Sequence, residues 1–355
     1  MIKKTDTPLP VPPGETLKEY LFNWDMTQKE LSERLGISPK HINEIIKGKV
    51  PITTETALKL ESVLGLPASF WIGLESTYQE ARARTEEAKS MEKEIEIVKS
   101  INFPQLVKLN WVKATKIIEE KVKYLRSFFQ VANLTLIPTT MPVAFRVSTT
   151  FEPTSYALAT WLRRGEILAS EIETKSFSKR KFNQLLKEIR TLTVKPQEEY
   201  IPLLEKKLAD CGIALVLVPH INKTHAQGAI NRKDSNKIIL QLSNRGSYAD
   251  IFWFSLFHEL GHIYYGHNKN EILIDDLDSN SEFEQEANTF ASERLIPFEK
   301  YNNLIKQPTI TRELILSFAK EEKIHPGVVV GRLCHDNVIH FSNFNDLRQK
   351  ILPLN

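Results

Sequence analysis

His258 and His262 enclose Glu259 in the run FHELGH, directly after an apolar segment at residues 251–256. On an α-helix, residues four apart share one face, so the two imidazoles can bind one metal ion while Glu259 projects beside it. Zinc prefers neutral imidazole ligands and, in catalytic sites, keeps one position for water. A neighbouring carboxylate can take a proton from that water. The stretch therefore predicts a zincin helix with Glu259 as general base.

A catalytic zinc site needs a third protein ligand, and two glutamates downstream are candidates. Glu284 starts a stripe of small residues at i, i+3, i+4 and i+7 of a predicted helix, which suits close packing against the first helix. We expect Glu284 to be the third ligand. Glu286 is the alternative, although it points to another side of the same helix. His267 is not expected to bind, because five helical residues rotate it away from the ligand face.

The motif at residues 258–262, followed by EQEANTFA from residue 284 and LIP at 295–297, resembles the ImmA/IrrE metallopeptidase-like domain. The resemblance implies a small zincin that binds Zn2+ through two histidines and one glutamate. These positions fall here on His258, His262 and Glu284, with Glu259 as the general base.

Strand character appears only shortly before the metal segment, at residues 212–219 and 237–242. His220 and His225 lie between these predicted strands, in a loop with Gly228. In the resembled family this loop borders the substrate cleft, so either histidine is a candidate to stabilise an oxyanion, with an ordinary surface-loop role as the alternative. The chain departs from the family at residues 248–250, where Tyr-Ala-Asp replaces a frequent arginine.

The N-terminal 75 residues predict a bundle of short helices. A proline-rich arm at residues 8–14 is expected to be extended, with the first helix at 16–22. Thr27, Ser38 and Thr53 are expected to cap the next three helices, which Gly36, Gly48 and Gly65 end. The second and third helices, joined by residues 36–38, have the geometry of a helix-turn-helix.

The third helix of this bundle is the expected DNA-recognition helix, because its isoleucines form a buried stripe and its polar residues face outward. The expected DNA contacts are Gln28, Ser38, Lys40, His41, Asn43 and Lys47. Residues 1–75 hold nine basic and ten acidic side chains, which favours a plain helical bundle instead. Residues 27–38 and 52–60, however, resemble the XRE/Cro-type helix-turn-helix of HigA-like antitoxins, which implies binding to double-stranded operator DNA.

The whole chain predicts a mainly α fold with a small α+β metal domain. We expect a helix-turn-helix domain at residues 1–75, a helical linker region at 76–200 and a zincin-like domain at 201–355. Residues 78–101 are dense in charge and lack Gly and Pro, which predicts an exposed spacer or self-association helix. The arginine pair at 163–164 is expected at an exposed helix end, and residues 325–333 are expected to pack the metal domain.

Composition limits the compartment and the partners of the chain. The net charge of +3 argues for no partner, and two distant cysteines, Cys211 and Cys334, are expected to be reduced core thiols of a cytosolic protein. The first residues lack the apolar segment of a signal peptide, and no run of 18 apolar residues occurs. We therefore expect a soluble cytoplasmic protein without a membrane partner.

Together the motifs resemble long HigA-type regulators with an appended ImmA/IrrE domain, and two functions follow. The first is a DNA-binding regulator with a zinc endopeptidase that cleaves a protein or peptide, such as a repressor, antitoxin or toxin, in a toxin–antitoxin, stress or mobile-element circuit. The second is a HigA-like repressor, for example a homodimer, whose zinc domain senses a partner without proteolysis. Glu259 favours the peptidase, because a purely structural zinc site needs no general base.

Overall fold

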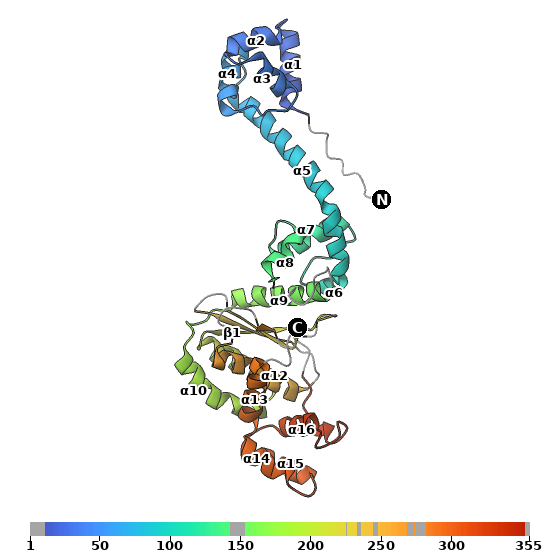
Figure 1. Cartoon of the computed structure of the whole chain (residues 1–355), viewed down its shortest axis with the longest axis vertical. Coiled ribbons are helices and arrows are strands. Elements are labelled where there is room, and N and C mark those ends of the chain that lie inside the picture. Colours follow the sequence, from blue (N-terminus) through green and yellow to red (C-terminus); the bar gives the residue numbers. More distant parts are fainter. Residues whose placement is uncertain are drawn as a thin grey trace. The chain divides into compact units, whose positions relative to one another are not determined.

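The computed structural model describes residues 11–142, 153–224, 226–232, 236–243, 248–267, 273–274 and 282–351. The chain forms two compact units, Met1–Glu94 and Ile95–Asn355. Helix α5 (Ala68–Ser100) contributes to both and runs through the predicted boundary at residue 75 without a break (Figure 1). The three-domain division stays a prediction.

The first unit is a helical bundle in which the three predicted N-caps and two of the predicted terminal glycines are confirmed. Thr27, Ser38 and Thr53 each accept a hydrogen bond from the backbone amide three residues on, at 3.1–3.2 Å. Gly36 and Gly65 end their helices with φ of 65° and 73°, a region that favours glycine. The helices are α1 (Pro13–Asn23), α2 (Gln28–Leu35), α3 (Pro39–Ile46), α4 (Thr54–Leu64) and the start of α5.

The extended arm predicted through residue 14 is wrong for its last two residues, and residues 8–10 lie outside the described part. Helix α1 starts at Pro13, where proline is tolerated because the first-turn N–H has no helical partner. Gly14 lies directly on α3, since a Cβ there would be 2.3 Å from the Cα of Ile46. The glycine thus belongs to the packing of the bundle.

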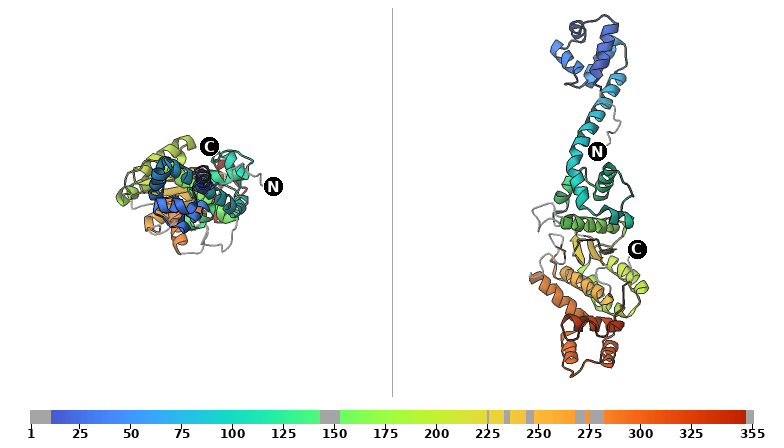
Figure 2. Two further views of the ribbon diagram at one scale, coloured as in Figure 1. Left: turned by 90° about the horizontal axis from the view of Figure 1, so that it is seen from above. Right: turned by 90° about the vertical axis from the view of Figure 1, so that its right-hand side faces the viewer.

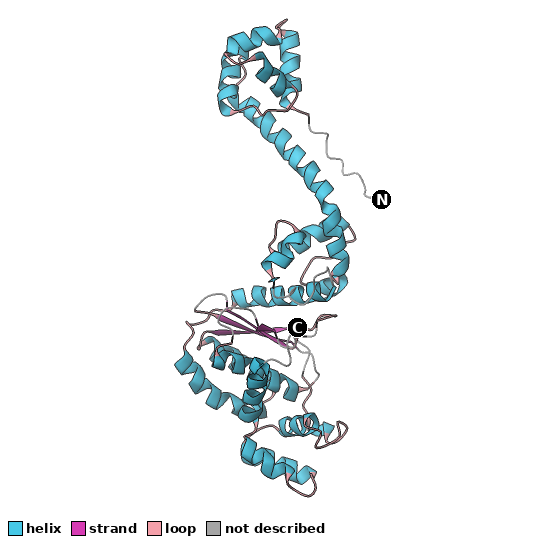
Figure 3. Cartoon of the chain, in the orientation of Figure 1, coloured by secondary structure: helices cyan, strands magenta, loops and turns pink. Residues whose placement is uncertain are grey.

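The second unit combines many helices with one small sheet (Figures 1 and 3). The sheet has the strand order β1-β3-β2-β4; β1 and β3 are parallel, and the other pairs are antiparallel. The mainly α fold with a small α+β region is therefore confirmed. Its strands are β1 (Ile213–Val218), β2 (Gly228–Arg232), β3 (Ile238–Ser243) and β4 (Leu273–Ile274). Its helices after α5 are α6 (Phe103–Lys108), α7 (Ile118–Phe129), α8 (Ile137–Thr140), α9 (Pro153–Glu171), α10 (Lys179–Ile189), α11 (Gln197–Ala209), α12 (Ala249–Tyr265), α13 (Glu282–Leu295), α14 (Phe298–Ile305), α15 (Arg312–Glu322) and α16 (Pro326–His335), with 3-10 turns η1 (Leu134–Leu136), η3 (Arg190–Val194) and η4 (Asn345–Leu347).

Helix α9 covers one face of the sheet, and α12 lies on the other (Figure 2). On the α9 face, Gln241 of β3 donates to the backbone oxygen of Trp161 at 2.8 Å. Gly165 permits this approach, because a Cβ there would be 1.8 Å from the Gln241 Oε1. The alternate residues of the same strands, including Ile238 and Leu240, belong to the core that contains α12.

Two expectations for this unit are wrong. The segment between the predicted strands contains β2, so Gly228 starts a strand and does not lie in a loop. Arg163 is buried within α9, not exposed at a helix end: its Nε donates to the Phe128 oxygen at 2.9 Å, and it pairs with Glu166 at 2.7 Å. Its paired guanidinium ties α9 to α7.

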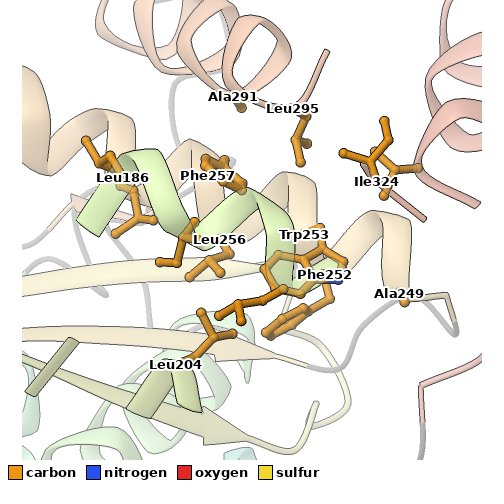
Figure 4. Packing of buried hydrophobic residues seen from close by; sticks show 14 of the residues in the cluster. Leu186, Leu204, Ala249, Phe252, Trp253, Leu256, Phe257, Ala291, Leu295 and Ile324 are labelled. Carbon is orange, nitrogen blue, oxygen red and sulfur yellow. The ribbon is translucent and has the colours of Figure 1, made fainter. Parts of the chain in front are cut away.

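Helix α12 is buried on nearly every side, which matches its apolar sequence. Helix α16 packs on it, so the packing role predicted for residues 325–333 is confirmed. Cys211 and Cys334 are free and buried, as predicted. Among the described residues, the helices are too short or too polar to cross a membrane. Figure 4 shows Phe252, Trp253, Leu256 and Phe257 of α12 together with Leu186 of α10 and Leu204 of α11, all members of one hydrophobic core.

Candidate functional site

Three buried side chains from α12 and α13 converge on one point. The Nε2 atoms of His258 and His262 lie 3.1 Å apart. Glu284 places Oε2 at 3.0 Å from the first nitrogen and Oε1 at 3.3 Å from the second. Each of the three residues is at most 8% exposed. The structure thus brings together the three residues expected to bind zinc.

Polar partners hold both imidazole rings from behind. The Nδ1 of His258 lies 3.0 Å from the Asn288 Oδ1, and the Nδ1 of His262 lies 3.0 Å from the Nδ1 of His267. The Nε2 of His267 lies 2.9 Å from a carboxylate oxygen of Glu286. Protons on the two ligand-histidine Nδ1 atoms and on the His267 Nε2 satisfy this chain, leaving both ligand-histidine Nε2 atoms for a metal.

These contacts distinguish the two glutamates that were candidates for the third ligand. Glu286 faces His267, whereas Glu284 faces the pair of histidines. Sequence reasoning set His267 aside as a ligand and did not find its orienting role, or that of Asn288. The position of Asn288 was predictable, because it shares the helical stripe of Glu284. The contact between His262 and His267 was not, because it depends on how the chain turns after α12.

The donor set and its spacing fit zinc. A tetrahedral zinc with bonds of about 2.0–2.1 Å holds its ligand atoms roughly 3.3 Å apart. The three observed separations, 3.1, 3.0 and 3.3 Å, lie close to this value. In the metal-free chain, burial raises the pKa of Glu284, but hydrogen bonds and charge from protonated imidazoles of His258 and His262 outweigh burial and lower the pKa to about 2. The carboxylate is therefore an anionic donor beside two imidazole donors.

Glu259 lies one residue along α12 from the first of these histidines and is 1% exposed. Strand β2 passes next to its carboxylate at Gly228, where a Cβ would be 2.1 Å from the Glu259 Oε1. Any larger residue at position 228 would displace the carboxylate. Sequence reasoning did not place this glycine in the site, because β2 itself was not expected.

His220 is not part of this cluster in the contacts that the structure describes. His220 Nδ1 lies 3.2 Å from the Thr224 hydroxyl, and the His220 carbonyl accepts from Gln105 at 3.3 Å. His220 therefore fastens its own loop to α6. His225 lies outside the described residues.

An arginine from the last part of the chain reaches the start of α12. Arg348 donates to both carboxylate oxygens of Asp250, at 3.1 and 2.7 Å. Its guanidinium also lies over the Tyr248 ring, 3.9 Å from the ring centroid. The negative charge of Asp250 is thus balanced by Arg348, which also contacts the Tyr248 ring.

Four of the six predicted DNA contacts lie on α2 and α3 in the first unit, and Ser38 and Lys47 are the cap residues of α3. Ile42, Ile45 and Ile46 are buried, which confirms the predicted apolar stripe of α3. The Ser38 hydroxyl oxygen also caps α3. The predicted contacts remain at least partly exposed: Gln28, Ser38, Lys40, His41, Asn43 and Lys47.

Two family models match separate parts of the chain. Residues 25–71 match a family described as Helix-turn-helix, and residues 220–333 match a family described as IrrE N-terminal-like domain. The first match contains α2, α3 and α4, and the second contains His258, His262 and Glu284.

Two relatives match a smaller part of the chain, about a fifth of its length. Virulence-associated protein I of Dichelobacter nodosus is 37% identical over 67 residues, which are 19% of this chain and 62% of that protein, so the chain spans less than two thirds of it. An uncharacterized HTH-type transcriptional regulator, YddM, of Escherichia coli is 28% identical over 71 residues, 20% of this chain and 76% of that protein.

Solved structures also resemble a quarter of the chain. An addiction module antidote protein of a HigA family from Coxiella burnetii is 34% identical, covering 24% of this chain and 94% of that one, with a TM-score of 0.22. The Pseudomonas aeruginosa antitoxin HigA, solved with the higBA promoter, is 31% identical over 24% and 94%, with a TM-score of 0.23.

Proposed function

Because the chain joins a DNA-binding helix-turn-helix domain of the XRE type to an IrrE N-terminal-like domain, we propose that it is a regulator with zinc-dependent endopeptidase activity. The observation that carries this proposal is the group formed by His258, His262 and Glu284, whose ligand atoms lie within 4.8 Å of one another, with Glu259 beside it. The substrate class is a protein or peptide, such as a repressor, antitoxin or toxin, in a toxin–antitoxin, stress or mobile-element circuit.

The residues of the cluster have separate roles in this proposal. His258, His262 and Glu284 would bind zinc, which in such sites lowers the pKa of a coordinated water and polarises a substrate carbonyl. Glu259 would accept the proton of the attacking water and return it to the leaving amine. Gly228 supports this role, because its missing side chain leaves room for the carboxylate.

Asn288→Ala is expected to weaken zinc binding about 10- to 100-fold, because it removes the acceptor that orients the His258 ring. The measurement is competition with a fluorescent zinc chelator. Thr289→Ala is the matched control, since Thr289 is exposed on the same helix. Equal zinc affinity in wild type and Asn288→Ala would contradict the orienting role.

We also propose that α3 reads operator DNA in the major groove, as recognition helices of this type do. Its buried isoleucines fix the helix on the bundle and leave Lys40, His41 and Asn43 on the outer side. Gln28 and Ser38, at or before the starts of α2 and α3, would contact phosphates. Because such domains commonly read two half-sites, we propose a homodimer on DNA.

Asn43→Ala is expected to alter sequence preference, because an amide reads base edges, whereas Lys47→Ala should weaken binding to all sequences. The Lys47 variant should also reduce the salt slope of binding by about one unit. Arg84→Ala is the control, as an exposed cation outside the matched helices. The measurement is binding to a randomised DNA library at several salt concentrations. An unchanged operator profile for both α3 variants would exclude this recognition helix.

A further inference from the structure

Helix α10 begins with three basic residues and lies on the outside of the second unit (Figure 1). Lys179, Arg180 and Lys181 fill its first turn, and all three are exposed. The opposite face is apolar and belongs to the core of the unit: Phe182, Leu185, Leu186 and Ile189. This face fixes α10 on the unit and leaves its cations in solvent.

The position of these cations is unfavourable for the helix itself. The N-terminus of a helix carries partial positive charge and is stabilised by acidic side chains, but α10 has none in its first turn. Helix α11 shows the favourable arrangement, with Glu198 and Glu199 in its first turn and Lys206 and Lys207 in its last. The stability of α10 therefore does not explain its three cations.

Further cations lie beside the start of α10, where the preceding segment meets the end of α11. The Lys175 amide donates to the carbonyl oxygen of Ala209 at 3.0 Å, and the Lys175 ammonium pairs with Asp210 at 2.5 Å. This ion pair is the main reason that the pKa of Asp210 lies below its ordinary value. The positive charges of Lys181 and Lys206 lower it further. The first turn of α10 and the last turn of α11 thus share one surface.

The exposed cations of this surface form what we call the basic patch: Lys175, Lys179, Arg180, Lys181 and Lys206. Asp210 balances one of these charges through its pair with Lys175. Among the described residues, no carboxylate forms an ion pair with the other four cations, and the nearby Glu188 is already paired with Lys207 at 2.8 Å. The five cations and the one carboxylate leave the patch with a net charge of +4.

The composition of the first unit indicates which polyanion this patch binds. Cations that contact phosphates provide nearly all of the sequence-independent affinity of a protein for DNA. Residues 1–75, however, hold nine basic and ten acidic side chains, so the helix-turn-helix part lacks the usual basic surplus. A basic patch elsewhere on the chain can provide the missing phosphate contacts.

We propose that the basic patch of α10 and α11 binds the phosphate backbone of double-stranded DNA, as a second contact in addition to α3. Phosphate contacts carry no sequence information, so the patch raises the affinity for operator and random DNA alike. This inference rests on the DNA-binding part of the proposed function and does not depend on the peptidase.

The test is the full chain with Lys179→Glu, Arg180→Glu and Lys181→Glu combined. Glutamates in the first turn favour the helix, so weaker DNA binding would not result from melting of α10. Affinity for a long fluorescent duplex of random sequence should fall about 10- to 100-fold, and the salt slope should fall by about two to three units. The ranking of sequences in a randomised library should stay as in wild type, because the patch reads no bases.

The control combines Lys306→Glu, Lys320→Glu and Lys323→Glu, which makes the same change in net charge at exposed positions in or directly after α14 and α15. It should bind DNA as wild type does. A triple glutamine variant of the α10 cations removes their charge without adding acids and should also bind more weakly. Fluorescence anisotropy at several salt concentrations measures each affinity.

Equal affinity of wild type and the α10 glutamate variant for random DNA would overturn the proposal, as would an equal loss in the control. Vesicles that contain anionic phosphatidylglycerol test a membrane surface as the other polyanion. Patch-dependent binding to these vesicles with unchanged DNA binding would overturn the proposal. Lys47→Ala separates this inference from the recognition helix. A loss of DNA affinity only in the α10 variant supports the patch and overturns the role of α3, whereas a loss only in Lys47→Ala overturns the patch alone.

Discussion

Replacing Glu259 by glutamine is expected to abolish peptide cleavage while zinc and operator binding persist. The amide keeps the size of the side chain but cannot accept a proton near neutral pH, and loss of a general base costs about 10²- to 10⁴-fold in rate. Adjacent helix residues diverge by about 100°, so Glu259 should not hold the metal. Mass spectrometry of cells with wild type or Glu259→Gln would follow fragments of the chain itself and of neighbouring gene products.

Glu282→Gln is the matched control for this experiment, because it makes the same chemical change at an exposed position of α13. Fragments present with wild type and Glu282→Gln but absent with Glu259→Gln support the peptidase. If no fragment depends on Glu259 while operator repression stays intact in both, the peptidase function is excluded. The chain would then act as a repressor whose zinc domain binds a partner without proteolysis.

The double variant His258→Ala with His262→Ala is expected to lose zinc completely, from about one ion per chain in wild type. It removes both nitrogen donors of the cluster, whereas Glu284→Gln replaces an anionic oxygen by a poorer neutral ligand and should only weaken binding. Elemental analysis of purified protein measures the occupancy. His340→Ala is the control, as an exposed histidine outside the cluster. Full zinc occupancy in the double variant would place the metal elsewhere.

The sequence predictions that succeeded rest mostly on contacts between residues that are close together in the chain. Thr27, Ser38 and Thr53 were identifiable as caps because a capping side chain bonds an amide only three residues away. The grouping of His258 with His262 follows from helical periodicity alone. Glu284 required one more step, because it lies on another helix, but the small residues in its stripe indicated close packing.

Long-range contacts account for most of what sequence reasoning missed. Strand β2 is five residues long and ends in Asn-Arg, so it carries little strand signal of its own, and pairing with β3 defines it. Arg163 looked exposed because its partner Phe128 is 35 residues away in the chain. The close approach of Gly228 to Glu259 likewise depends on how the sheet packs against α12. The local sequence around either residue does not predict this packing.

The pair formed by Asp250 and Arg348 has a consequence for the order of events during protein synthesis. Their separation of 98 residues means that α12 emerges from the ribosome long before the guanidinium that neutralises its first-turn carboxylate. The helices α1 to α4, by contrast, pack with near neighbours in sequence and can fold as soon as they emerge. A nascent chain halted before residue 348 would therefore carry a finished N-terminal bundle and an unfinished second unit.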